Sequence, residues 1–121
     1  MNILLVDDDA SLVEVMARLI RMLGHTVDTA LSGEEAAAML SVDMRQFDLL
    51  ITDQQMERVS GIELIALARK HSPETACVLM SGHVDAVDGR SLANDSNARY
   101  IEKPFTLDTI QALLEDVKAA A

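Results

Sequence analysis

The chain has 121 residues and a formal net charge of −10, from 20 acidic and 10 basic side chains. This length suits a single domain over residues 1–121 with a core of its own, and a hydrophobic share of 50% argues against intrinsic disorder. The excess of negative charge argues against nucleic acid or an anionic membrane as a direct partner.

Short apolar runs alternate along the chain with segments whose apolar residues recur at helical spacing. The runs predict five strands, in chain order Asn2–Val6, Thr26–Ala30, Asp48–Thr52, Ala76–Met80 and Arg99–Glu102. The other segments predict five helices, which begin near residues 11, 32, 60, 85 and 107. Ser11, Ser32 and Ser60 each stand three residues before a glutamate, which predicts capping boxes at the first three helix starts. Thr106 is the expected N-cap of the last helix, and the helix over about 85–93 rests on a weaker pattern.

The alternation of strands and helices predicts the fold class. Right-handed crossover connections turn such a chain into a parallel sheet with helices on both faces. The strand order 2-1-3-4-5 is one of two common solutions for a chain of this size. We therefore expect a doubly wound, flavodoxin-like α/β fold with a five-stranded parallel sheet and five helices.

Polar residues follow four of the predicted strands. Because parallel strands end at one edge of the sheet, that edge should receive Asp7, Asp8 and Asp9, then Asp53, Ser81 and Lys103. Carboxylates a few ångströms apart repel by about 1 to 4 kcal/mol per pair, and a hard divalent cation such as Mg²⁺ would offset that cost. A simpler interpretation is that Asp8 or Asp9 only caps the first helix, but this leaves Asp7 unexplained.

With these residues the sequence resembles the receiver (response-regulator) domain of bacterial two-component signalling, over essentially its whole length. The motif positions are Asp7 and Asp8 after Ile3-Leu4-Leu5-Val6, Asp53 in Asp53-Gln54-Gln55-Met56 with Gly61 downstream, Ser81 in Met80-Ser81-Gly82, and Lys103 in Lys103-Pro104-Phe105. Each motif alone is weak. All four in this order, at these strand ends, are highly specific.

The resemblance implies a phosphorylation switch rather than a turnover enzyme. Asp53 would accept a phosphoryl group from a phosphohistidine on a histidine kinase or a histidine phosphotransfer protein. Asp8 and Asp53 would ligate Mg²⁺, Asp7 would act largely through water, and the backbone carbonyl of Gln55 would complete the metal site. Lys103 and the hydroxyl of Ser81 would each contact a phosphoryl oxygen.

The resemblance also assigns secondary roles. Tyr100 matches the family's switch aromatic, and the Lys103-Pro104 peptide bond would be cis. Gln55 and His83 occupy the two variable positions that tune the lifetime of the phosphoryl group. Glu57 departs from the family, which usually has proline there. The fourth helix, the fifth strand and the fifth helix would form the face that meets a downstream protein.

Three other functions compete with this interpretation. A haloacid-dehalogenase-type phosphatase should carry a second Asp where this chain has Gln55, and a flavodoxin-type cofactor binder needs a phosphate loop where this chain has three carboxylates. The serious rival is a receiver-shaped interaction module that works without phosphorylation. No apolar run approaches the roughly 20 residues of a membrane span, and the amino terminus lacks the basic region of a signal peptide. We therefore expect no membrane partner and a cytoplasmic location.

Overall fold

The computed structural model describes residues 1–42, 47–82 and 97–120. Five strands form one parallel sheet in the order β2-β1-β3-β4-β5. They are β1 (Asn2–Val6), β2 (Thr26–Ala30), β3 (Leu49–Asp53), β4 (Ala76–Ser81) and β5 (Ala98–Glu102). The helices among these residues are α1 (Ala10–Met22), α2 (Gly33–Val42), α3 (Gly61–His71) and α5 (Leu107–Ala120).

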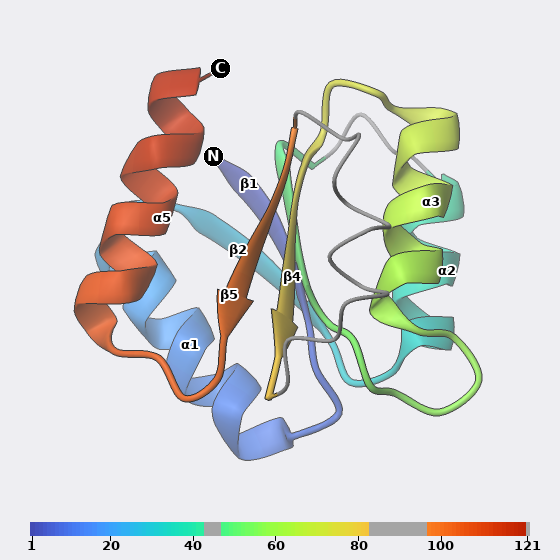
Figure 1. Ribbon diagram of the computed structural model, residues 1–121, viewed down its shortest axis with the longest axis horizontal. Helices are drawn as coiled ribbons and strands as arrows, with labels where there is room; N and C mark the ends of the chain where they lie inside the picture. Colours follow the sequence, from blue (N-terminus) through green and yellow to red (C-terminus); the bar gives the residue numbers. More distant parts are fainter. Residues whose placement is uncertain (43–46, 83–96, 121) are drawn as a thin grey trace.

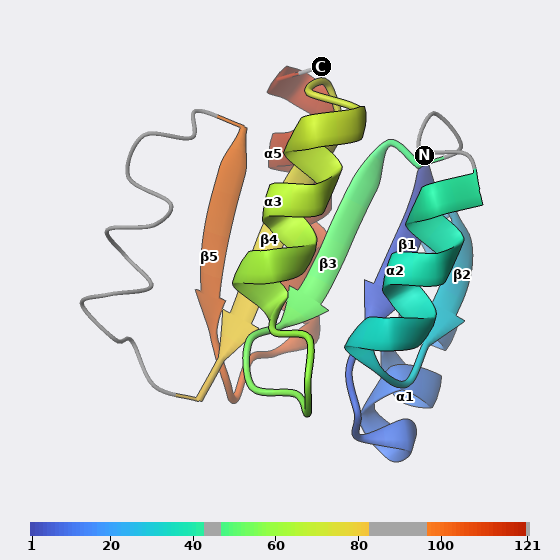
Figure 2. The same cartoon turned by 90° about the vertical axis from the view of Figure 1, so that its right-hand side faces the viewer.

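The helices cover both faces of the sheet. Helices α1 and α5 lie on one face, and α2 and α3 lie on the other (Figures 1 and 2). The predicted strand order and the doubly wound arrangement are therefore confirmed. The described residues hold four helices rather than the five predicted, because the helix expected near residues 85–93 lies outside them.

The sheet separates two apolar clusters. Ile3, Leu5 and Ile51 pack with α1 and α5 on one side, whereas Leu4 and Leu50 pack with α2 and α3 on the other. Successive strand residues point to opposite faces, so a central parallel strand needs apolar side chains at every position. This requirement explains the continuous apolar runs of β1 and β3, whose side chains are fully buried from position 3 to 6 and from 49 to 51.

The start of α1 differs from the prediction. Asp9, not Ser11, is the N-cap, because its Oδ1 accepts a hydrogen bond from the Leu12 backbone N–H at 3.2 Å. The Asp9 N–H in turn donates to Asp7 Oδ1 at 3.0 Å, which turns the chain as soon as β1 ends. The helix therefore begins at Ala10, and Ser11 lies inside its first turn. The capping hypothesis is right for Asp9 and leaves Asp7 for the site described below.

The other predicted caps fare better. The full capping box at Ser60 and Glu63 is present at the start of α3, and Thr106 Oγ1 accepts from the Thr109 N–H before α5. The capping box predicted at Ser32 is only half present: Ser32 Oγ accepts from the Glu35 N–H at 3.0 Å, but Glu35 Oε2 accepts from the Leu31 N–H. None of the helices in residues 1–42, 47–82 and 97–120 is long and apolar enough to cross a membrane.

Candidate functional site

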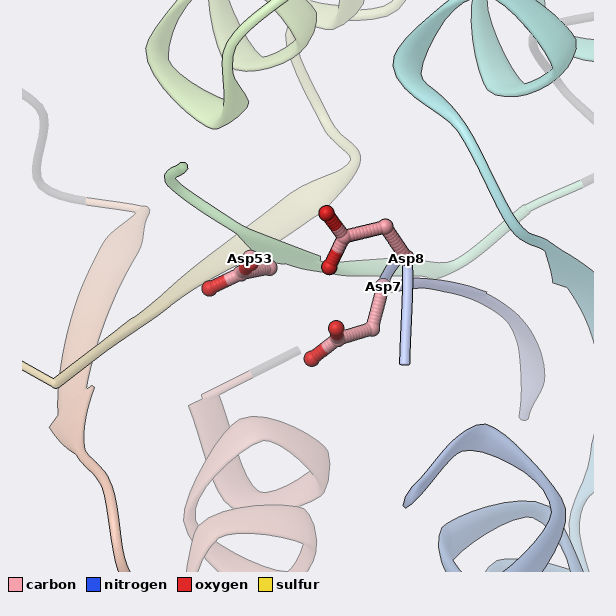
Figure 3. Close-up of side chains that lie close together, drawn as sticks. All are labelled: Asp7, Asp8 and Asp53. Atoms are coloured by element: carbon pink, nitrogen blue, oxygen red, sulfur yellow. The ribbon is translucent and has the colours of Figure 1, made fainter. Parts of the chain in front are cut away.

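Three carboxylates meet at the carboxyl ends of β1 and β3. One oxygen atom from each of Asp7, Asp8 and Asp53 lies within 4.8 Å of the other two, and Figure 3 shows the three side chains close together. Asp7 is 1% exposed and Asp53 is 7% exposed, whereas Asp8 is exposed to solvent. The site is therefore a buried pair of acids with a third acid at its solvent side.

Strand register explains why these acids come together. In the β1–β3 pair Val6 stands opposite Thr52, so the next residues, Asp7 and Asp53, lie level with each other. Side chains two residues apart in a strand point to the same face of the sheet. Asp7 and Asp53 thus share the face of Leu5 and Ile51, which pack against α1 and α5. The two carboxylates therefore lie on one face of the sheet, at the edge where a parallel α/β sheet collects its ligands.

Lys103 brings a positive charge to the two buried acids. Its Nζ lies 2.7 Å from Asp7 Oδ2 and 3.3 Å from Asp53 Oδ1. The Lys103 backbone N–H donates to the Ser81 carbonyl at 2.8 Å, which holds the residue beside the end of β4. The Lys103-Pro104 peptide bond is cis, as the family resemblance implied.

The electrostatics of the site follow from burial and crowding. Burial raises the pKa of Asp53 above its ordinary value, the negative charge of Asp7 raises it further, and the nearby Lys103 ammonium opposes the shift. Burial alone would lower the pKa of Lys103, but its hydrogen bond to Asp7 and the charges of Asp7 and Asp53 outweigh this and raise it. The Lys103 ammonium thus pairs with two of the three carboxylates, Asp7 and Asp53. The oxygen atoms of the three carboxylates form a donor set that suits a hard divalent cation such as Mg²⁺.

Three further predicted residues, Ser81, Gln55 and Tyr100, are among the described residues. Ser81 is the last residue of β4 and is 3% exposed. Gln55 is exposed in the loop that follows Asp53. Tyr100 lies in β5 beside Leu79 of β4 and packs, partly buried, against the apolar cluster of α2 and α3. His83 lies outside the described residues.

The loop between β3 and α3 contains a residue that the sequence analysis missed. The Gln54 backbone N–H donates to the Met80 carbonyl at 2.9 Å, and the Gln54 carbonyl accepts from the Gly61 N–H at 3.1 Å. Its side-chain Oε1 accepts from the Ile62 N–H at 2.8 Å. A polar residue between a buried strand and a capping box is the signal that could have indicated this role.

The loop and the first residue of α3 also approach other backbone closely. A Cβ atom on Gly61 would lie 2.4 Å from the carbonyl oxygen of Asp53, and one on Gly33 of α2 would lie 2.3 Å from the carbonyl oxygen of Val59. Arg58 has a positive φ of 64°, and its Nη1 pairs with Glu34 Oε2 at 3.2 Å. The loop after Asp53 is thus packed against both α2 and the strand that carries the acid.

Comparison with known proteins gives one consistent result. The family model described as "Response regulator receiver domain" matches residues 3–115. Transcriptional regulatory protein TcrA of Mycobacterium tuberculosis is 32% identical over 114 residues, which are 93% of this chain and 44% of that protein. Transcription factor SKN7 of Chaetomium thermophilum is 30% identical over 113 residues, 93% of this chain and 15% of that protein. The chain therefore spans less than half the length of these relatives.

A solved structure agrees with the sequence comparisons. The response regulator receiver domain protein of Clostridium thermocellum superposes with a TM-score of 0.84 at 27% identity, and the alignment covers 96% of this chain and 92% of that one. The family match spans all the strand ends that carry Asp7, Asp8, Asp53, Ser81 and Lys103. On the strength of that match, the chain belongs to the response regulator receiver domain family.

Proposed function

We propose that residues 1–121 form one receiver domain that switches a signalling pathway when Asp53 is phosphorylated. The observation that carries this proposal is the arrangement of charged groups around the buried Asp53. Lys103 Nζ contacts the carboxylates of Asp7 and Asp53, and oxygen atoms of Asp7, Asp8 and Asp53 lie within 4.8 Å of one another. Phosphoryl transfer depends chiefly on positioning and charge neutralisation, and this arrangement can supply both. The phosphodonor would be a histidine kinase or a histidine phosphotransfer protein.

In the transfer, an Asp53 carboxylate oxygen attacks the phosphorus atom as the phosphorus–nitrogen bond to the donor histidine breaks. Carboxylates form such acyl phosphates in ATPases. Asp8, Asp53 and the Gln55 carbonyl would hold Mg²⁺, with Asp7 acting largely through water. The bound cation supplies positive charge that offsets the carboxylates and the phosphoryl oxygens. Lys103 and the Ser81 hydroxyl would each contact a phosphoryl oxygen.

The phosphoryl group would then alter the output surface. Phosphorylation adds close to two negative charges at one site, and charge-assisted contacts to Lys103 and Ser81 favour the conformation that makes them. Tyr100, partly buried on β5, is the residue we expect to report this change to a downstream protein that docks near β5 and α5. Gln55 and His83 would tune the lifetime of the phosphoryl group. We place the protein in the cytoplasm, without a membrane or nucleic acid as direct partner.

Incubation with a small phosphodonor and Mg²⁺, read by intact mass, tests the proposal. We expect the wild-type protein to gain one phosphate adduct, and we expect Asp53→Asn to abolish it, because the amide is not a nucleophile. Asp48→Asn is the matched control: this acid is exposed at the opposite end of β3, where it accepts from the Asn2 N–H. It should leave the adduct unchanged.

Two outcomes would contradict the proposal. One is a wild-type protein that gains no adduct at saturating phosphodonor and Mg²⁺. The other is an adduct that survives in Asp53→Asn, which would place the modification on another residue. Either result would favour the rival hypothesis, a receiver-shaped interaction module that works without phosphorylation of Asp53.

A further inference from the structure

The first turn of α3 depends on the residue next to Asp53. The first N–H groups of any helix have no partner within the helix. In α3 the Glu63 N–H donates to Ser60 Oγ, whereas the Gly61 and Ile62 N–H groups both donate to Gln54. The Gly61 bond reaches the Gln54 carbonyl at 3.1 Å, and the Ile62 bond reaches Gln54 Oε1 at 2.8 Å. The Ser60 N–H, the first of the four, donates to Glu63 Oε1, so Gln54 satisfies two of these four groups.

Gln54 is also tied to the sheet. Its own N–H donates to the Met80 carbonyl of β4 at 2.9 Å, which continues the β3–β4 pairing one residue beyond Asp53. Residues 55–60 therefore form a loop whose two ends are held together by the backbone and the side chain of a single residue. The backbone of Gln55, the next residue along, starts from this fixed point.

The loop needs such a restraint because its sequence offers few others. Residues 55–60 include no proline, so the backbone there has more conformations available in the absence of tertiary contacts. Arg58 holds a positive φ of 64°, a conformation that costs a non-glycine residue energy. The Arg58–Glu34 pair is exposed to solvent at both side chains, and exposed pairs contribute little.

We propose that Gln54 is a positioning residue for the metal site. By bonding the first turn of α3 to the end of β3, it fixes the backbone of Gln55 and so the carbonyl that we assign to Mg²⁺. The inference rests on the proposed function, since it concerns the cation bound beside Asp53. Groups that orient a metal ligand without touching the metal commonly change metal affinity about 10–100-fold when removed.

The test replaces the side-chain acceptor while keeping its size. Gln54→Met removes Oε1, and Gln111→Met makes the same chemical change at an exposed position of α5. Calorimetric titration with Mg²⁺ alone should show an affinity about tenfold weaker for Gln54→Met and unchanged for Gln111→Met. In phosphorylation by a small phosphodonor, the Mg²⁺ concentration for half-maximal rate should rise by a similar factor, while the rate at saturating Mg²⁺ stays near that of wild type.

Amide hydrogen exchange tests the hydrogen bond itself. Exchange at the Ile62 N–H should become roughly three- to tenfold faster in Gln54→Met, as expected for the loss of one such bond. Gln54→Glu keeps an acceptor oxygen and should retain the protection. This variant also shows whether a weakened metal site reflects the lost acceptor or a general loss of folding.

The outcomes separate this inference from the proposed function. If wild type binds Mg²⁺ and accepts phosphate but Gln54→Met binds Mg²⁺ equally well, the positioning role is wrong and the switch stands. If Gln54→Met lowers the maximal rate without changing the Mg²⁺ dependence, the role is also wrong. If wild type binds no Mg²⁺, the proposed metal site and the inference fail together.

Discussion

Gly61→Ala is expected to destabilise the protein by about 2–4 kcal/mol, because the new methyl group has no room. It would lie 2.4 Å from the Asp53 carbonyl oxygen and 2.6 Å from Leu79 Cδ1. The first of these atoms is backbone in the central strand, so α3 must shift away from β3 to relieve the contact. Urea unfolding followed by circular dichroism measures the loss as a lower midpoint at an unchanged slope.

Gly82→Ala is the control for this substitution. The added Cβ would meet no atom of the described residues within 4 Å, so the free energy of unfolding should change by less than about 0.5 kcal/mol. If both variants unfold at the same urea concentration, the close approach of α3 to Asp53 is not a constraint on the fold. The proposed switch predicts a further effect of Gly61→Ala: slower phosphorylation, because a shift of α3 displaces the strand end that carries Asp53.

Asp53→Asn should have the opposite effect on stability. In metal-free buffer near neutral pH we expect a gain of about 1–2 kcal/mol, because the amide removes a buried charge that Asp7 repels. The gain is partly offset by the lost pairing with Lys103, whose Nζ keeps its closer partner, Asp7, at 2.7 Å. A substitution that abolishes the proposed phosphorylation is thus expected to stabilise the fold, as is common for residues kept for function.

The gain should depend on pH in a defined direction. The pKa of Asp53 is raised by burial and by Asp7, so the folded state binds this proton more tightly than the unfolded chain. As pH rises from the ordinary carboxyl pKa of about 3.9 through the raised value, the wild type loses stability that Asp53→Asn keeps. Plotted against pH, the free energies of unfolding of wild type and Asp53→Asn should therefore diverge between the ordinary and the raised pKa, and run parallel at higher pH.

Urea unfolding of both proteins across that range measures the divergence, with Asp48→Asn as the control that should follow the wild type. Millimolar Mg²⁺ should narrow the gap, because a cation that binds the folded wild type stabilises it by mass action. If wild type and Asp53→Asn had the same free energy of unfolding at every pH, the charge on Asp53 would not destabilise the folded state. The raised pKa assigned to this carboxyl would then be wrong.

The sheet could be predicted from the sequence because local pattern and global topology agree there. The apolar runs of β1 and β3 are buried on both faces, and right-handed crossovers leave few ways to order five parallel strands. The same topology predicts that Asp7 and Asp53 meet, since residues at neighbouring strand ends share an edge. The strand ends differ by one residue: β3 and β4 each end one residue later than predicted, so Asp53 and Ser81 belong to the strands themselves.

Two kinds of contact could not be predicted: the choice between competing helix caps, and hydrogen bonds that form only when a loop closes. Ser11 and Asp9 both match helix-capping patterns, and the choice of Asp9 depends on its bond to Asp7, which exists only after the chain turns. The bond from Ile62 to Gln54 Oε1 spans eight residues and forms only when α3 packs on β3. Likewise, the sequence places Lys103 near Asp53, but only the folded site shows that its shorter contact is with Asp7.

The amino-terminal residue and the end of α5 lie at the same pole of the molecule, away from the carboxyl ends of the strands (Figure 1). An affinity tag or a fluorophore fused at either end is therefore held far from Asp53. A sensor surface that captures the protein through such a tag would present the acidic edge outward, toward a phosphodonor in solution. The geometry thus permits binding and phosphorylation to be measured on immobilised protein without the attachment covering the reactive carboxylate.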